Sequence, residues 1–303
     1  MTHSANINTT NTANNTNTAT DRKIILITGA NSGMGLASSI ALAKQGHHII
    51  MACRNLKRGQ QALEQAKRES GSDQLTLMTC DLGSLENIRE FAAEFYKRYD
   101  HLDVLLNNAG VVNPTRKETA DGFEMSIGVN HLGHFLLTSL LLDALQQAKA
   151  ARIIVVSSNA YKIGKIHWDD PYLQDGYNVV SAYSQSKLAN LYFTSVLAER
   201  LKDTSVTVNS LHPGAVATSI GVDRDTGFGK RLLSALAHTP FFQTPEQGAE
   251  TAIFLATDPS VAGQTGQYFY RKKVMPLQSR ALDRQQALRL WAWSERQTGL
   301  SQT

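Results

Sequence analysis

Lys23-Ile-Ile-Leu-Ile-Thr-Gly-Ala-Asn-Ser-Gly-Met-Gly35 is the stretch that decides the fold of this 303-residue chain. Its apolar part predicts a strand over residues 23–28, and the residues that follow predict a helix over 34–44. Glycines stand between the two, at positions 29, 33 and 35. Unpaired backbone N–H groups at such a strand-to-helix turn can hold the pyrophosphate of a dinucleotide. The stretch therefore predicts the opening unit of a dinucleotide-binding domain.

Short runs rich in Ile, Val and Leu alternate with longer amphipathic stretches along the rest of the chain. The expected fold class is therefore α/β, a single Rossmann-type doubly wound parallel sheet with helices on both faces. Seven strands are expected, over residues 23–28, 48–53, 75–80, 104–107, 152–157, 207–212 and 266–270. Helices are expected over residues 34–44, 56–69, 85–99, 123–145, 184–201 and 245–256.

The composition favours one domain of ordinary size, because 303 residues with 42% hydrophobic content can bury one α/β core. Residues 1–20 are mostly Asn, Thr and Ala and are expected to form a disordered polar tail before a domain over 21–303. No segment is typical of a secretory signal or a membrane span. Cys53 and Cys80 both fall near the ends of interior strands, which favours core packing and a reduced, cytoplasmic setting.

The charge pattern and the histidine spacing bear on two other kinds of ligand, nucleic acids and metal ions. The net charge is +4, and the basic residues are interleaved with acidic ones as on a solvated helix face, so no nucleic-acid partner is expected. His131 and His134 flank part of a helix, but no third ligand stands at a supportive spacing, so no metal is expected.

Tyr183-Ser-Gln-Ser-Lys187 places a phenol and an ammonium four residues apart, on one face of a helix. Hydride transfer between an alcohol or carbonyl and a nicotinamide requires a proton to enter or leave the substrate oxygen. A free phenol has a pKa of about 10, and a nearby ammonium is expected to lower it. Tyr183 is thus the expected acid/base, with Lys187 supplying the charge, and the pair indicates an oxidoreductase.

Further motifs stand at the carboxyl ends of expected strands, where open α/β sheets bind ligands. They are Asn107-Asn-Ala-Gly110, Ser157-Ser158, and Pro213-Gly214 with Thr218. With these, residues 21–300 resemble the short-chain dehydrogenase/reductase family. The retinol-dehydrogenase-like branch is the most similar, through Ala52-Cys-Arg54, Val129-Asn-His-Leu-Gly-His134, Ser186-Lys-Leu-Ala-Asn190, Leu211-His-Pro-Gly214 and Trp293-Ser-Glu-Arg-Gln-Thr-Gly-Leu300.

The resemblance implies a nicotinamide cofactor. Its expected contacts are Gly29, Asn31, Ser32, Gly33, Met34, Gly35, Arg54, Asp81, Leu82, Asn107, Ala109, Gly110, Tyr183, Lys187, Pro213, Gly214, Val216 and Thr218. Arg54 stands where an acidic residue would hold the ribose 2′-hydroxyl of NAD, and a guanidinium can instead pair with a 2′-phosphate. NADP(H) is therefore expected over NAD(H), unless Arg54 only faces solvent. Asp81 resembles the adenine-contacting acid of the family, with a helix cap as the alternative.

The resemblance also implies roles in catalysis. Ser158 would position the substrate oxygen, and Lys187 would additionally hold the nicotinamide ribose hydroxyls. Asn130 matches a fourth catalytic position that supports the lysine through water. Ser157 is not expected to take part. A homo-oligomer pairing through the helices that contain Asn130 and Lys187 is expected by the same analogy.

The expected substrate is a hydrophobic small molecule with a carbonyl or alcohol group. Residues 219–243 combine glycines with apolar side chains and are a candidate lid, with an ordinary surface helix and loop as the alternative. Trp291 and Trp293 are expected to pack rather than to stack on substrate. Two other functions stay open: a light-dependent protochlorophyllide-type C=C reductase, and an NADP-sensing binding protein without turnover.

Overall fold

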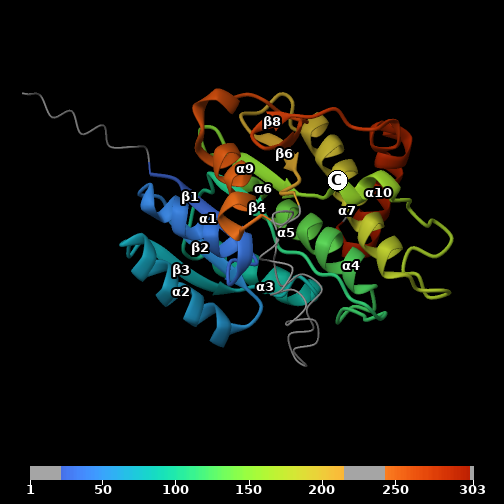
Figure 1. The fold of residues 1–303 in the computed structure, drawn as a ribbon, viewed down its shortest axis with the longest axis horizontal. Coiled ribbons are helices and arrows are strands. Elements are labelled where there is room, and N and C mark those ends of the chain that lie inside the picture. Colours follow the sequence, from blue (N-terminus) through green and yellow to red (C-terminus); the bar gives the residue numbers. More distant parts are fainter. Residues whose placement is uncertain (1–21, 215–242, 301–303) are drawn as a thin grey trace, which may run out of the picture.

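The computed structural model describes residues 22–214 and 243–300 (Figure 1). One eight-stranded sheet runs through them in the order β3-β2-β1-β4-β5-β6-β7-β8, and every neighbouring pair is parallel except β7 and β8. The strand order reverses direction between β1 and β4, as in other doubly wound sheets. The predicted fold class, a Rossmann-type α/β sheet with helices around it, is confirmed.

The strands and helices alternate along the chain. The strands are β1 (Ile24–Thr28), β2 (His48–Cys53), β3 (Leu75–Thr79), β4 (Val104–Asn107), β5 (Arg152–Val156), β6 (Thr207–Leu211), β7 (Tyr268–Tyr270) and β8 (Lys273–Val274). The longer helices are α1 (Gly33–Lys44), α2 (Leu56–Ser70), α3 (Leu85–Tyr96), α5 (His134–Leu140), α6 (Leu142–Gln147), α7 (Val179–Arg200), α9 (Pro245–Thr257) and α10 (Arg284–Thr298). Short turns of helix are α4 (Met125–Ile127), η1 (Gly128–Gly133), η2 (Asn159–Ile163), η3 (Pro259–Val261) and η4 (Ser279–Leu282).

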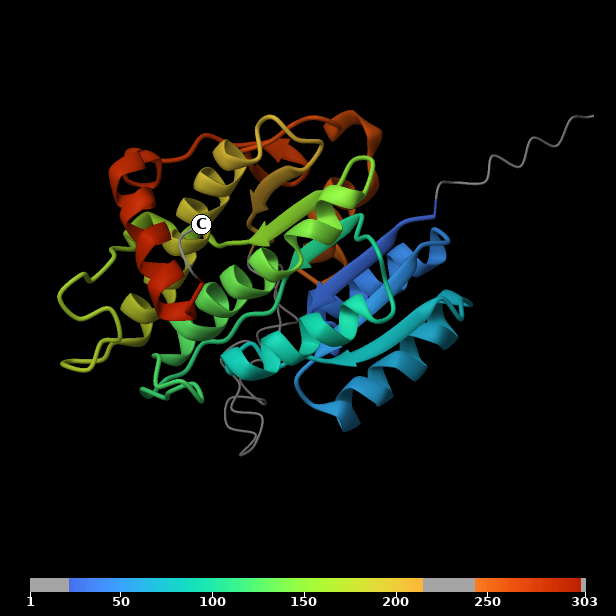
Figure 2. The ribbon, with the colours of Figure 1, turned by 180° about the vertical axis from the view of Figure 1, so that it is seen from behind.

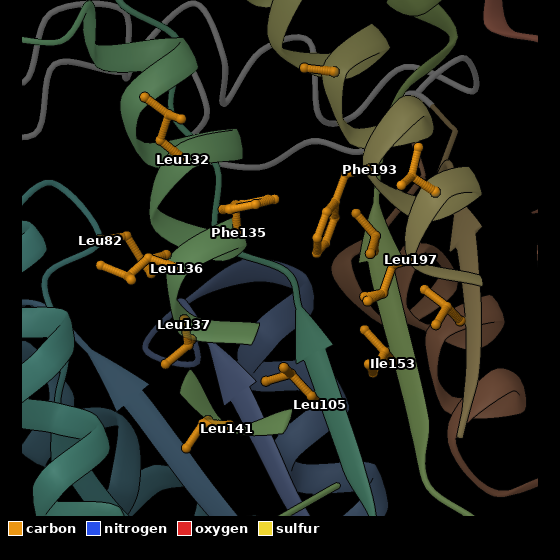
Figure 3. Packing of buried hydrophobic residues seen from close by; sticks show 14 of the residues in the cluster. Leu82, Leu105, Leu132, Phe135, Leu136, Leu137, Leu141, Ile153, Phe193 and Leu197 are labelled. Carbon is orange, nitrogen blue, oxygen red and sulfur yellow. The ribbon is translucent and has the colours of Figure 1, made fainter. Parts of the chain in front are cut away.

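Apolar side chains fill a layer on each face of the sheet. Within β1, Leu26 belongs to one layer while Ile25 and Ile27 belong to the other, because successive side chains of a strand point to opposite faces. On the first face, Figure 3 shows Phe135 of α5 and Phe193 of α7 pointing toward one another above the strands. Between the two layers the parallel central strands end at one edge of the sheet, and the expected site residues gather at that edge.

The expected helix over residues 123–145 is broken into four pieces, so that prediction was wrong in detail. The chain makes one turn of α4, widens into the π-helix η1, and continues as α5 and α6. Gly128 lies against the side chain of Thr119, and Gly133 lies against the backbone of Leu82, so neither position has room for a Cβ atom. Close packing at two glycines thus accompanies the local widening, which periodicity alone did not reveal.

Helix α7 begins earlier than expected, at Val179 instead of Ser184. Asn178 caps it, since its side chain accepts hydrogen bonds from the N–H groups of Val180 and Ser181 at 2.9 and 3.1 Å. Tyr183 is therefore a second-turn residue of a formed helix. Val180, Tyr183 and Lys187 consequently share one face of that helix.

The C-terminal helix α10 packs along α7 (Figure 2). Trp291 and Trp293 are both buried there, and the ring centroids of Trp291 and Phe135 are 4.9 Å apart, so the expected packing role is confirmed. Cys53 and Cys80 are free and buried, as expected for core residues. The expected homo-oligomer stays a prediction.

Several expectations concern residues outside the described part of the chain. They are the polar tail over 1–20, the cofactor contacts Val216 and Thr218, and residues 219–242 of the candidate lid. Within residues 22–214 and 243–300, none of the helices combines the length and apolar character needed to span a bilayer. The same residues hold no group of three or more metal-ligating side chains.

Candidate active site

The glycine turn after β1 packs directly on the loop after β4. Gly29 has a φ of +66°, which favours glycine, and a Cβ atom there would lie 3.0 Å from the Cα atom of Ala109. A Cβ atom on Gly35 would lie 2.7 Å from Asn108 Nδ2, and it would also meet the carbonyl oxygen of Gly29. Close contact between the two loops therefore requires both glycines.

The two neighbouring asparagines after β4 do different things. Asn107 was expected to contact the cofactor, but its side chain is buried and donates to Thr138 Oγ1 at 2.9 Å. Asn108 was missed by the sequence reasoning, although it holds the glycine turn by donating from Nδ2 to the carbonyl of Thr28 at 2.8 Å. The alternation of side chains along a strand could have distinguished the two asparagines. Successive side chains point to opposite faces, so a buried side chain at the last strand position places the next one on the other face.

Ser158 follows β5 and caps η2, accepting a hydrogen bond from the N–H of Ala160 at 3.2 Å. Its side chain is also near enough to the Tyr183 phenol to act on the pKa of that phenol, which it lowers. The neighbouring Ser157 points elsewhere, donating from Oγ to the carbonyl of Lys187 at 2.8 Å. The structure thus brings Ser158 and Tyr183 together, and it uses Ser157 to hold α7 on the sheet.

Burial raises the pKa of Tyr183, and the Ser158 side chain opposes that shift. The sequence had predicted a lowered pKa from the nearby ammonium, so the net direction differs from expectation. The physical reason is desolvation, which disfavours the charged phenolate. In this state the phenol holds its proton at neutral pH and is a proton donor.

Lys187 is 3% exposed, and its Nζ atom lies 5.5 Å from the centroid of the Tyr183 ring. Burial lowers the pKa of its ammonium to about 8. Among the described residues, its one hydrogen-bond acceptor is the carbonyl of Val156 at 3.1 Å. An ammonium has three donors, so a buried lysine with one acceptor leaves capacity for hydroxyl groups of a bound molecule.

Gly110 gives access to that lysine. A Cβ atom built on Gly110 would lie 3.6 Å from Lys187 Nζ and 3.7 Å from Asn130 Oδ1. Gly110 therefore places backbone, and no side chain, directly beside the two buried polar groups. The arrangement fits the ribose end of a nicotinamide cofactor, whose hydroxyls would supply the missing acceptors.

Asn130 lies inside the π-helix η1, and it is completely buried. Its side chain accepts from the N–H of Val111 at 2.8 Å and donates to the carbonyl of Val111 at 3.1 Å and to Ser186 Oγ at 3.0 Å. The side chain thus clamps the segment that follows Gly110 to helix α7. The structure places Asn130 next to the lysine, with its side chain in a supporting position.

The second strand ends at an exposed basic site. Arg54 directly follows β2 and is exposed, as a group facing a ribose phosphate would be. Arg58, in the first turn of α2, was not singled out from the sequence, and its Nε atom is buried without a hydrogen-bond partner among the described residues. An unsatisfied buried guanidinium donor fits an anionic ligand. Two arginines therefore stand within the turn that follows β2.

Asp81 and Leu82 form the turn after β3. Asp81 Oδ1 accepts from the N–H of Gly83 at 2.9 Å, while Ser84 caps α3, so the alternative of a helix cap at Asp81 was wrong. Leu82 is buried in the core, and only its backbone remains for a cofactor.

The other expected contacts lie at the same sheet edge. Asn31 and Ser32 precede α1, Met34 is a buried residue of its first turn, and Pro213 and Gly214 follow β6. The expected site residues described by the structure thus follow the ends of β1 to β6, except for Asn130 in η1 and Tyr183 and Lys187 in α7.

Comparison with known proteins agrees with this geometry. The family model for short chain dehydrogenase matches residues 23–227. Human retinol dehydrogenase 14 is 44% identical over 291 residues, covering 92% of this chain and 87% of that protein. Human retinol dehydrogenase 13 is 42% identical, covering 92% of this chain and 85% of that protein.

A solved structure extends the agreement to three dimensions. A single-residue variant of actinorhodin polyketide ketoreductase with NADPH superimposes with a TM-score of 0.64 at 25% identity, covering 82% of this chain and 95% of that chain. The chain therefore belongs to the short-chain dehydrogenase/reductase family, and it is an oxidoreductase that acts on CH–OH or C=O groups with a nicotinamide cofactor.

Proposed function

We infer that this protein is an NADP(H)-dependent oxidoreductase that reduces the carbonyl group of a hydrophobic small molecule, with Tyr183 as the acid/base. The observation that carries the proposal is the buried cluster at the carboxyl end of β5. There the Ser158 side chain acts on the Tyr183 phenol by lowering its pKa, and the Lys187 ammonium lies 5.5 Å from the centre of the phenol ring.

The chain's own residues account for proton transfer. Ser158 donates to the substrate oxygen and fixes its position beside the phenol. Tyr183 gives its proton to that oxygen as negative charge develops there, and the Lys187 ammonium stabilises the phenolate that remains. A bound nicotinamide supplies or accepts the hydride. Because the raised pKa keeps Tyr183 protonated near neutrality, the resting state is suited to reduction.

The preference for NADP(H) is supported by the basic end of β2. Arg54 is exposed at the position where an acidic side chain would favour NAD, and Arg58 has an unsatisfied buried donor. A 2′-phosphate would give both guanidinium groups an acceptor. The ketoreductase structure described above holds NADPH.

A hydrophobic substrate is supported by two exposed apolar side chains beside the cluster. Val180 is 54% exposed, on the same face of α7 as Tyr183, and Ile163 is 64% exposed at the end of the helix that Ser158 caps. Both side chains would lose contact with water against an apolar ligand. The similarity to retinol dehydrogenases makes retinoids a natural part of a substrate panel.

The test is turnover of NADPH against a panel of aldehydes and ketones that includes retinal, with NADH in parallel. Tyr183→Phe should lower kcat by about 10² to 10⁴-fold and leave NADPH binding nearly intact. Tyr192→Phe is the matched control, because its hydroxyl lies on the same helix but only donates to the carbonyl of Arg280.

The outcomes separate the alternatives. Unchanged turnover in Tyr183→Phe would remove Tyr183 from the mechanism. NADPH binding without turnover on any member of the panel would favour a sensor, and light-dependent reduction of a pigment C=C bond would favour a protochlorophyllide-type reductase.

A further inference from the structure

His134 is a chemistry-bearing residue of the sequence that the proposed mechanism does not use. Its ring is 1% exposed, at the start of α5, where the π-helix η1 ends. Nδ1 lies 3.1 Å from the carbonyl oxygen of Asn130, and Nε2 lies 2.9 Å from Thr28 Oγ1. The imidazole thus stands between the helix that carries Asn130 and the strand that leads into the glycine turn.

The partners determine which nitrogen carries the proton. A carbonyl oxygen only accepts, so Nδ1 must be the N–H donor to Asn130. Burial lowers the pKa of His134 to about 4, with the charge of Lys187 acting in the same direction, so the ring is neutral near pH 7. Nε2 is therefore an acceptor, and the hydroxyl proton of Thr28 points at it.

The orientation of that hydroxyl has a consequence for the loop after β4. With its proton on the histidine side, Thr28 Oγ1 presents its lone pairs to the N–H groups of Asn108 and Ala109, both at 2.9 Å. Those two residues pack against the glycine turn, and the loop continues to Gly110, beside Lys187. Asn130 closes the circuit by binding Val111 at the far end of the same loop.

A closed ring of hydrogen bonds therefore joins β1, the loop over residues 108–111 and the π-helix. In this ring the buried polar groups bond one another, so removing one member weakens the link between the loop and the π-helix, although Thr28 Oγ1 and the N–H of Asn108 can still bond the carbonyl of Leu106. A neutral histidine suits the central place, because it donates at one nitrogen and accepts at the other.

We propose that His134 is a positioning residue that couples the cofactor-binding loop over residues 108–111 to the π-helix holding Asn130, so that cofactor binding and catalytic geometry depend on one bridge. The proposal rests on the proposed function for its effect on turnover. Its effect on cofactor affinity is independent of any substrate.

The test is a double-mutant cycle on Thr28 and His134, read by NADPH affinity from fluorescence titration, by kcat and by thermal unfolding. His134→Phe keeps the ring volume and removes both bonds, and Thr28→Val keeps the shape and removes the hydroxyl. His134→Phe should weaken NADPH binding about tenfold and lower kcat by a similar factor, because its two buried hydrogen bonds are lost. Thr28→Val also loses the bonds to the N–H groups of Asn108 and Ala109, so its effects should be at least as large. The double variant should match Thr28→Val, since both changes break the same bridge.

Two controls distinguish positioning from a general loss of packing. Thr28→Ser retains the hydroxyl and should restore affinity and kcat to within about twofold. His131→Gln changes the neighbouring buried histidine, whose Nε2 contacts Ser294 Oγ at 2.7 Å on α10, and should lower the unfolding temperature while sparing NADPH affinity.

The proposal would be overturned if the losses of NADPH affinity and kcat in the two single variants multiply in the double variant. It would also be overturned if His134→Phe has wild-type affinity and kcat. If His134→Phe does not fold, the NADPH affinity and kcat of Thr28→Val are compared with those of Thr28→Ser. Equal affinity and equal kcat in these two variants would contradict the bridge. If no substrate is ever turned over, the proposed function fails, but the NADPH titrations still judge the bridge.

Discussion

The proposed catalytic region at the end of β5 and the proposed ribose region at the end of β2 lie on the same sheet edge but are built in opposite ways. At the first, Lys187 and Asn130 are buried, and Ser158 acts on the pKa of the Tyr183 phenol. At the second, Arg54 is exposed directly after the strand. Chemistry on a substrate oxygen requires charges held in a fixed geometry away from water, whereas cofactor choice requires only an accessible cation. Substitutions should therefore have much larger effects at the first region.

The sharpest contrast comes from two lysines. Lys187→Met removes the buried ammonium and should lower kcat by about 10² to 10⁴-fold, because the phenolate loses its stabilising charge. Lys162→Met removes an exposed charge on η2 and should leave kcat within about twofold. Steady-state kinetics with NADPH decides, and a kcat for Lys187→Met close to wild type would contradict the catalytic region as described.

Two neighbouring serines give a comparison within the catalytic region. Ser158→Ala removes the proposed donor to the substrate oxygen and should lower kcat by about 10² to 10³-fold. Ser157→Ala loses its bond to the carbonyl of Lys187, which should cost about 1 kcal/mol of unfolding free energy with a change in kcat below tenfold. Denaturant unfolding and turnover are measured on both variants, and the interpretation fails if their effects on kcat are equal.

At the proposed ribose region, substitution of Arg54 should change the preference for NADPH over NADH without changing kcat. Arg54→Ala should lower the preference for NADPH over NADH by about ten- to hundredfold in kcat/KM, because a charge-assisted contact with the 2′-phosphate is lost. The kcat at saturating NADPH should remain near wild type. Lys57→Ala, an exposed cation of the first turn of α2, is the control. An unaltered preference would mean that Arg54 only faces solvent.

The smallest expected effect is on pH dependence. Lys187 is an ammonium below its pKa of about 8 and a neutral amine above it, so carbonyl reduction should fall by about tenfold between pH 7 and 9. The direction follows from the need for positive charge beside the developing phenolate. A profile of kcat for reduction checks this, and a constant kcat over that range would show that the charge of Lys187 is not required.

Much of the fold followed from periodicity, because long amphipathic helices and buried parallel strands have distinct patterns. The expected strand over residues 266–270 exists as β7 but is shorter, and the two-residue β8 was not foreseen because it is too short for a pattern. The break at η1 was also missed, since glycines inside an apolar helix pattern do not reveal what they pack against.

The site was predictable only in part. Spacing named Tyr183 and Lys187, and the family resemblance added Ser158; the structure brings the three together. It also named Asn107, whose side chain turns toward Thr138, and passed over Asn108. A motif specifies which residue types occur, but the side to which each one points depends on where the strand ends.

Local patterns and spacing predicted strands β1 to β7, the glycine turn and the placing of polar residues at strand ends, because those properties depend on residues that are near one another in the chain. The upward pKa shift of Tyr183, the downward pKa shift of Lys187 and the bridge through His134 became visible only in the folded protein. Burial and contacts between separate helices, strands and loops create those properties. Thr28 and His134 are 106 positions apart, and folding brings them to 2.9 Å.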